Sequence, residues 1–242
     1  MNHTYSEAIA QHYVGYRPPL HQPILAKALG DHPRQSMGLD IGSGVGNSAL
    51  ALTQYCDTVY GIEPNFNMFC QALPHSRIHY QNSNLEDFET PAHKFDLFSF
   101  AGTLSYLKSP DLIEQLLYLG REGATIIIYD FEIRYEAVFQ GLGLKQPPSE
   151  DSFYDAQLDL SGLPRKGIRK RNAYQGRLNF SCNPKELAHL LLSEQAFHND
   201  FVARWGSEYY HRSLRRLIEK KLGENPYPLQ ANTFFIRYQL PE

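Results

Sequence analysis

Apolar segments alternate with amphipathic segments through the first half of the chain. Five short apolar runs fit buried strands, and the segments between them carry apolar residues at helical spacing. The predicted strands are residues 36–41, 58–63, 77–81, 95–102 and 124–132, and the predicted helices are 6–13, 22–29, 47–56, 65–73 and 110–120. Continuous apolar strands that are separated by helices indicate a parallel sheet covered on both faces.

The pattern becomes less regular after Glu132. Residues 141–183 hold turn-forming residues and a basic cluster, and we interpret them as an insertion packed on the sheet, because they are too short and too polar for a core of their own. Helical spacing returns in two later segments, 200–205 fits a sixth strand, and the chain closes on a strongly apolar run. These segments are residues 184–197 and 207–222 for the helices and 232–240 for the terminal strand.

Composition limits the kinds of partner. The chain has 242 residues, of which 42% are hydrophobic and 20% charged, and its net charge of −3 provides no overall field for nucleic acid or an anionic membrane. The longest apolar run, ATIIIY, is far shorter than the roughly 20 residues of a membrane span. The first residues lack a signal-peptide pattern, and three unpatterned cysteines indicate free thiols, so we expect a cytoplasmic protein.

Three alternate glycines, Gly42, Gly44 and Gly46, stand where the first predicted strand meets its helix. Such a turn lies at the carboxyl edge of a parallel sheet, where open α/β sheets bind ligands, and glycine lets the backbone approach a ligand closely. Asp40 precedes the glycines, and Glu63 closes the second strand, where a carboxylate can accept both hydroxyls of a ribose. Two carboxylates without a phosphate-binding lysine indicate a nucleoside that carries positive charge; the alternative is a tight turn without a ligand.

The motif that surrounds these glycines departs from the dinucleotide fingerprint, because Asn47 stands where that fingerprint has Gly or Ala. The stretch LDIGSGVGNSA instead resembles the first motif of class I S-adenosylmethionine-dependent methyltransferases. In order along the chain, YGIEP, YQNSNLEDF, KFDLFSFAGTLSYL and LGREGATIIIYDFE resemble the motifs that follow it in this family. The resemblance covers about residues 5–132, is loose beyond them, and points to the small-molecule, type 11-like members.

The resemblance implies S-adenosylmethionine as the cofactor and gives the matched residues roles. Asp40 would organise the cofactor's amino group, Glu63 would hold the ribose hydroxyls, and Arg17 would pair with the carboxylate. Each also has an ordinary structural role open to it: Asp40 can pin the loop, Glu63 can cap a helix, and Arg17 can lie on the surface. The other implied cofactor residues are Gly42, Gly44 and Gly46 along the methionine and ribose, Pro64, Asn82 and Ser83 around the adenine, and Ala101 beside the reactive methyl.

A general base is needed only if the acceptor must lose a proton. The candidates are Tyr106 and Glu132, which follow the fourth and fifth predicted strands, and Tyr209 and His211 in the predicted C-terminal helix are further ones. The ten histidines show neither the H-E-x-x-H spacing nor a Cys/His spacing, so no metal is predicted.

The sequence thus predicts a methyltransferase that acts on a small-molecule acceptor by direct in-line transfer. The fold would be a Rossmann-like, doubly wound α/β sheet, mostly parallel, with an antiparallel terminal strand. We expect one domain over 1–242, with an N-terminal cover (1–35), a cofactor-binding half (36–132), a lid insertion (141–183) and a C-terminal half (184–242). Two alternatives stay open: an RNA methyltransferase that uses the basic segments 165–177 and 211–221, and a non-catalytic S-adenosylmethionine-binding protein.

Overall fold

The structure is a computed structural model that describes residues 6–30, 32–148, 155, 157–164 and 166–242. The chain divides into two units. The helical unit comprises Met1–Pro18, Glu132–Phe153 and Arg177–Asn232, and the sheet unit comprises Pro19–Phe131, Tyr154–Gly176 and Thr233–Glu242. Three long strands, β5, β6 and β7, have residues in both units.

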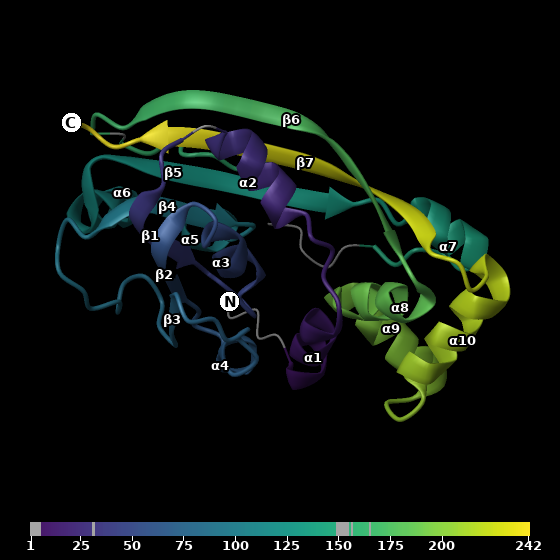
Figure 1. Ribbon diagram of the computed structural model, residues 1–242. Coiled ribbons are helices and arrows are strands. Elements are labelled where there is room, and N and C mark those ends of the chain that lie inside the picture. Colours follow the sequence, from purple (N-terminus) through teal and green to yellow (C-terminus); the bar gives the residue numbers. More distant parts are fainter. Residues whose placement is uncertain (1–5, 31, 149–154, 156, 165) are drawn as a thin grey trace. The chain divides into compact units, whose positions relative to one another are not determined.

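Seven strands form one sheet in the order β3-β2-β1-β4-β5-β7-β6 (Figure 1). They are β1 Gln35–Ile41, β2 Cys56–Ile62, β3 Ile78–Gln81, β4 Phe95–Ala101, β5 Gly120–Ile133, β6 Arg169–Cys182 and β7 Tyr227–Gln239. β1 pairs in parallel with β2 and β4, β2 with β3, and β4 with β5. The order of the strands reverses at β1, so the carboxyl ends of β1 and β4 form the switch point at which open α/β sheets bind ligands.

The terminal strand β7 runs opposite to β5, as the arrowheads in Figure 1 show. Near the start of β5, the Gly123 N–H donates to the carbonyl of Pro241 at 2.9 Å. One residue further along β5, the Ala124 carbonyl accepts from the Leu240 N–H at 2.8 Å, so partner numbers fall as β5 numbers rise. The predicted antiparallel terminal strand is confirmed.

Helices connect the strands and make up most of the helical unit. In the sheet unit, Pro110 stands in the first turn of α6, where a missing N–H costs no hydrogen bond. In the helical unit, α8 begins with a capping box between Asn183 and Glu186. The sheet unit holds α2 His21–Leu29, α3 Asn47–Leu52, α4 Phe66–Phe69, α5 Leu104–Leu107 and α6 Pro110–Leu119, and the helical unit holds α1 Glu7–Gly15, α7 Glu136–Leu142, α8 Pro184–Leu192, α9 Gln195–Trp205 and α10 Tyr210–Leu222.

The central strands are buried at consecutive positions over much of their length. Leu39 of β1, Phe98 of β4 and Ile126 of β5 are fully buried and belong to one apolar cluster. A strand of a parallel sheet loses both of its faces to packing, which is why these runs carry apolar residues at consecutive positions and not at alternate ones. The five predicted strands of the first half are confirmed, with β5 extended at its start to Gly120.

The predicted sixth strand at 200–205 is wrong, because these residues lie in α9. The buried side chains of this helix are Phe197 and Phe201, four residues apart, which is the spacing of one helix face. The run DFVARW is too short to distinguish the period of a strand from that of a helix. The apolar Phe197, which lies one turn before Phe201, favours the helix.

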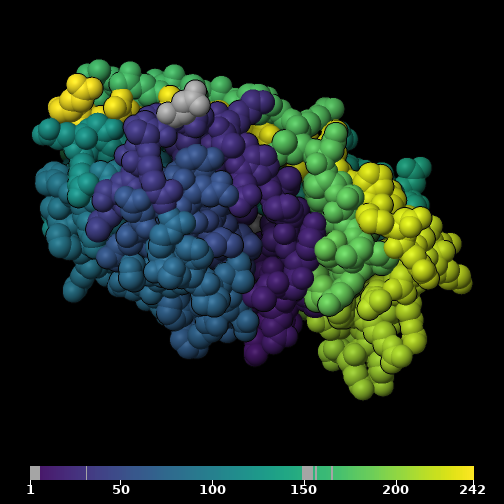
Figure 2. All heavy atoms as spheres, viewed as in Figure 1, coloured from purple at the N-terminus to yellow at the C-terminus, as the bar shows by residue number. Residues whose placement is uncertain are grey.

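The polar insertion predicted for residues 141–183 contains a strand that the sequence analysis missed. β6 occupies its last part and forms the edge of the sheet beyond β7; its green atoms follow the upper margin of Figure 2. Only every second residue in its second half is partly buried, and its first five residues are exposed. Basic and polar side chains on an edge strand discourage pairing with other chains, and the same residues conceal the strand in a hydrophobicity pattern.

Candidate active site

The loop after β1 needs its glycines for backbone conformation. Gly42, Gly44 and Gly46 have φ values of 74°, 55° and 91°, in the left-handed region that other residues rarely adopt. Gly46 is the residue that precedes α3. The loop is tied to the end of β2, because the N–H groups of Gly42 and Ser43 both donate to the carbonyl of Ile62, at 2.9 and 3.0 Å.

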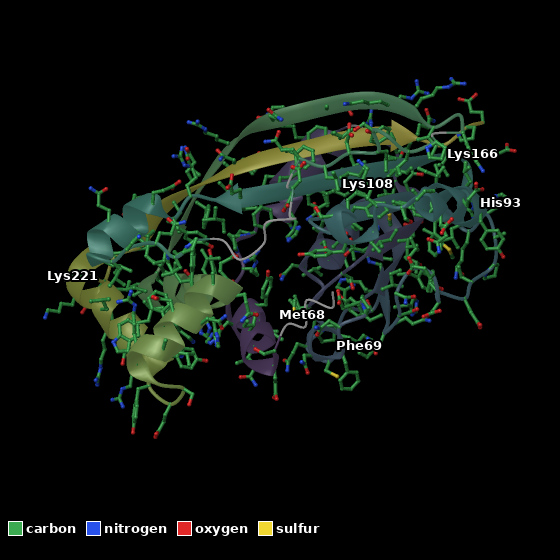
Figure 3. All side chains as sticks on the ribbon, turned by 180° about the vertical axis from the view of Figure 1, so that it is seen from behind. Met68, Phe69, His93, Lys108, Lys166 and Lys221 are labelled. Carbon is green, nitrogen blue, oxygen red and sulfur yellow. The ribbon has the colours of Figure 1, made fainter. Side chains whose placement is uncertain are left out.

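The surroundings of the three glycines differ. A side chain at Gly42 would overlap the methyl group of Thr103, and one at Gly46 would overlap the hydroxyl of Tyr80. Around the position that a Cβ would take at Gly44, the described residues beyond its chain neighbours place one atom within 4 Å, the terminal methyl of Met68 in α4, at 3.4 Å (Figure 3 labels Met68). Packing therefore explains the first and third glycines, whereas the middle one leaves its backbone open to close approach.

Glu63 joins the loop after β1 to the loop after β2. Its Oε2 accepts from the Gly44 N–H and its Oε1 accepts from the Asn65 N–H, both at 2.8 Å. The residue is 9% exposed, and burial raises the pKa of its carboxyl group while the two backbone donors oppose that shift. Each carboxylate oxygen can accept a second hydrogen bond, so Glu63 positions the loop and keeps acceptor capacity for a ligand.

Asp40 lies at the end of β1 and is completely buried. Its Oδ2 accepts from the Ser48 hydroxyl at 2.5 Å, which connects the strand to the first turn of α3. Burial raises the pKa of Asp40 to about 6, against the lowering effect of the Ser48 hydrogen bond. The structure therefore places a carboxyl group that is costly to ionise next to the glycine loop.

Four buried polar atoms around this loop lie outside hydrogen-bond geometry with the described residues, although the Ser99 hydroxyl is close enough to Asp40 to lower the pKa of its carboxyl group. They are Asp40 Oδ1, Ser43 Oγ, Tyr80 Oη and Ser99 Oγ. Asp40 and Ser99 stand opposite each other in the register of β1 and β4. Because buried polar atoms are nearly always paired in folded proteins, such a cluster indicates a place for bound water or a polar ligand.

The residues predicted around the adenine lie beside Glu63. The Asn82 amide nitrogen donates to the carbonyls of Glu63 and Pro64, at 2.7 and 3.2 Å, which leaves its Oδ1 available as an acceptor. Pro64 and Asn82 are exposed, and the Ser83 hydroxyl donates to the Asn84 carbonyl. The structure thus brings Asp40, the three glycines, Glu63, Pro64 and Asn82 to one edge of the sheet, as predicted from the sequence.

Ala101 ends β4, and the segment after it was only partly identified from the sequence. Thr103 fixes this segment to β1, because its hydroxyl donates to the Ile41 carbonyl at 2.7 Å. Tyr106 follows in α5 and is 50% exposed. A shallow pocket after β4 and β5 is lined by Gly102, Thr103, Leu104, Tyr129, Asp130 and Asp155, among others.

Arg17 and Glu132 belong to the helical unit, and their roles at this site stay predictions. The Arg17 guanidinium donates to the Ser193 hydroxyl at 3.1 Å, forms an ion pair with Glu194 at 3.4 Å, and lies over the ring of Tyr13. Glu132 is exposed and accepts from the Asn232 amide at 3.3 Å.

Several residues of the site were not found from the sequence. Tyr80, Ser99, Thr103 and Asp130 come from four different strands or loops, and none stands in a short motif with the glycines. Asp130 offered one signal, since it is a carboxylate at the end of an otherwise apolar run.

Residues 39–128 match the family model described as a methyltransferase domain. This stretch runs from β1 into β5 and contains the glycine loop, Asp40 and Glu63. The likeness to this family therefore concerns this stretch of the chain. The ordered motifs and the open α/β sheet therefore agree with the resemblance that the sequence showed.

A curated protein is also similar to part of this chain. A provisionally named methyltransferase from Dictyostelium discoideum is 25% identical over 126 residues, which are 51% of this chain and 48% of that protein. The match thus spans about half the length of this curated relative. Among the helices of the described part of the chain, none is long and apolar enough to cross a bilayer.

Solved structures extend the likeness in fold beyond residues 39–128. A provisionally named type II methyltransferase from Anaeromyxobacter dehalogenans superposes with a TM-score of 0.63 and 16% identity, over 99% of this chain and 98% of its own. A second solved structure is phosphoethanolamine N-methyltransferase 2 from Haemonchus contortus, in complex with phosphomonomethylethanolamine and S-adenosylhomocysteine. It superposes with a TM-score of 0.54 and 17% identity, over 98% of this chain and 58% of its own. At these identities the likeness concerns the fold.

Proposed function

We propose that this protein is an S-adenosylmethionine-dependent methyltransferase that acts on a small-molecule acceptor by direct in-line transfer. The observation that carries the proposal is the arrangement at the switch point of the sheet. There, the buried Glu63 accepts from the backbone N–H groups of Gly44 and Asn65 and so joins the two loops, and the buried Asp40 lies at the end of β1 with its Oδ1 outside hydrogen-bond geometry. A structural neighbour in complex with S-adenosylhomocysteine supports the same ligand class.

The residues present fit this cofactor. Glu63 has acceptor capacity left for two ribose hydroxyls, and Asn82 Oδ1 can accept from the adenine amino group. Asp40 Oδ1 and the Ser43 hydroxyl are unpaired polar atoms beside the loop, suited to hold the amino acid part directly or through water. Two carboxyl groups also favour a ligand with a cationic amino group and a sulfonium.

Catalysis by this chain consists mainly of positioning. S-adenosylmethionine, when bound, supplies a methyl group that is already activated by its sulfonium. The loop and Glu63 would orient the cofactor, and the small residues Ala101 and Gly102 would leave room for the acceptor beside it. Tyr106 and Glu132 remain the candidates for a base, which is required only where the acceptor loses a proton in the transfer.

The ion pairs and hydrogen bonds of the basic segment 165–177 support a small acceptor over RNA. Lys166 forms an ion pair with Glu114 and Lys170 with Asp159, and the Arg171 guanidinium donates to the Gln239 side chain (Lys166 is labelled in Figure 3). Phosphate binding would have to compete with these contacts. Arg169 and Arg177 of the same segment are exposed and form no such contact among the described residues, and Arg165 lies outside the described residues.

The test is turnover in a defined mixture. The protein is incubated with S-adenosylmethionine and a pool of small metabolites, or with total RNA, and S-adenosylhomocysteine is measured by mass spectrometry. We expect its formation with the metabolite pool and only background with RNA. Formation with RNA alone would reverse the acceptor assignment, and tight cofactor binding without turnover in either pool would favour the non-catalytic alternative.

A further inference from the structure

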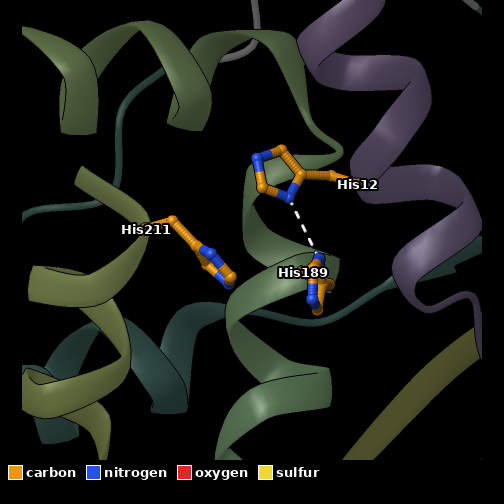
Figure 4. Close-up of side chains that lie close together, drawn as sticks. All are labelled: His12, His189 and His211. Atoms are coloured by element: carbon orange, nitrogen blue, oxygen red, sulfur yellow. Dashed lines mark hydrogen bonds between the residues drawn. The ribbon is translucent and has the colours of Figure 1, made fainter. Parts of the chain in front are cut away.

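Three histidine rings from three helices meet inside the helical unit. His12 belongs to α1, His189 to α8 and His211 to α10, and Figure 4 shows the rings turned toward one another. One nitrogen of each ring lies within 4.8 Å of the others. The Nδ1 atoms of His12 and His189 are 3.0 Å apart.

The His189 ring occupies the space that a side chain on the last residue of α1 would fill. Gly15 is the last residue of α1, and a side chain there would overlap the ring, whose Cε1 lies 2.6 Å from the position of its Cβ. The φ of Gly15 is not in the left-handed region, so the backbone does not require glycine. The close approach of the imidazole explains why the helix ends on a residue that lowers its stability.

The rings are held in the neutral state that binds metals. Burial and the neighbouring histidines lower the pKa of His12 to about 3, and burial and the charges of His211 and Lys185 lower the pKa of His189 to about 4. Burial and the cationic Arg215 and Lys185 also lower the pKa of His211. These cations reduce affinity for any positive ion, so binding must come from the lone pairs of the three rings.

Hydrogen bonds alone leave this cluster incomplete. His12 Nε2 lies 3.0 Å from the Tyr210 hydroxyl, and His12 Nδ1 faces His189, but the Nε2 atom of His211 is buried without a partner among the described residues. Tyr210 occupies the place of an outer partner, which fixes the ring so that Nδ1 points into the cluster.

We propose that His12, His189 and His211 bind one late first-row divalent metal ion, with Zn²⁺ as the fitting example. Three neutral imidazoles with a fourth position open to water are a common ligand set for this class. Ligands at about 2.05 Å in a tetrahedron are separated by about 3.4 Å, which lies within the spread of the three rings. On binding, His12 would donate its Nε2 proton to the Tyr210 oxygen and present the lone pair of Nδ1 to the metal. The proton in the contact between the two Nδ1 atoms then belongs to His189 and moves to its Nε2, so both rings stay neutral and no net proton is released.

The consequence would be a clamp that joins α1 to α8 and α10. The sequence spacing predicted no metal, because His12 and His189 are 177 residues apart and belong to no common motif. The three ligands all lie in the helical unit, and binding of a metal by these rings does not require the proposed methyl transfer.

The test is a titration of the metal-stripped full-length protein with Zn²⁺ in competition with a chromophoric chelator. We expect one equivalent with a Kd at or below about 1 μM. His189→Gln and His211→Gln should each weaken binding by at least about 100-fold, and Tyr210→Phe by about tenfold, as for loss of an outer partner. The matched control is His79→Gln, an exposed histidine of β3, which should bind as the wild type does.

Circular dichroism checks that each variant is folded. If His189→Gln does not fold, the visible absorption of the Co²⁺-loaded wild type decides, because a tetrahedral site absorbs far more strongly than an octahedral one. The proposal is overturned if the wild type takes up no stoichiometric metal, if a folded His189→Gln or His211→Gln variant keeps wild-type affinity, if His79→Gln loses it, or if Co²⁺ gives only the weak octahedral spectrum.

Discussion

Glu63 is the residue whose replacement tests the proposed cofactor site most sharply. In Glu63→Gln, the amide oxygen can still accept from one of the two backbone N–H groups, of Gly44 or Asn65. The NH₂ group then faces the other N–H, so two donors oppose each other. The same change removes the negative charge and one acceptor from the ribose position.

The expected magnitudes follow from these contacts. Loss of one hydrogen bond to a charged, buried acceptor should lower the free energy of unfolding by about 1.5–3 kcal/mol. Loss of charge-assisted acceptance from the ribose should weaken cofactor binding by about 1–3 kcal/mol, which is about 5- to 160-fold in Kd. The variant should stay folded, because the expected loss in free energy of unfolding is smaller than the usual stability of a domain.

The assay is calorimetric titration with S-adenosylhomocysteine, together with urea denaturation. The matched control is Glu122→Gln, an exposed glutamate of β5, which should change neither quantity. If Glu63→Gln is folded and binds S-adenosylhomocysteine as tightly as the wild type, Glu63 only holds the loop and the ribose assignment is wrong.

Two further predictions concern the loop itself. The folded pKa of Asp40 is about 6, above the usual 3.8, so the folded state binds more protons between these values and Asp40 lowers stability as pH rises through them. The stability of Asp40→Asn relative to the wild type should therefore rise by about 2.4 kcal/mol between pH 4 and pH 7 in urea denaturation. An unchanged difference would contradict the buried, costly carboxylate. Gly46→Ala should lower the free energy of unfolding by at least about 1 kcal/mol more than Gly143→Ala does. Both glycines have positive φ, but only Gly46 faces the Tyr80 hydroxyl. Equal losses of thermal stability would show that this contact does not constrain the loop.

The sequence predicted the sheet where burial is continuous and failed where it is not. β1, β4 and β5 are apolar at consecutive positions because both faces are covered. β6 is an edge strand with exposed polar residues, so its sequence is close to that of a loop. Part of α9 was predicted as a strand because six residues of mixed polarity fit the period of a strand as well as that of a helix.

The candidate site was predictable where its residues are close in sequence. Asp40 and the glycines stand in one motif, and Glu63 closes the next strand, so strand and turn patterns were enough to group them. Tyr80 and Ser99 reach the loop only through the order of the strands in the sheet. The histidine cluster depends on the packing of three helices, which no local pattern contains.

The central claim is that the loop after β1, with its two carboxyl groups, binds S-adenosylmethionine. Calorimetric titration of the intact wild-type chain with S-adenosylhomocysteine tests it most directly, with a thermal-shift measurement on the same sample. The account predicts one molecule bound per chain and a raised Tm. A folded protein that shows neither heat of binding nor any thermal shift at saturating ligand would contradict it.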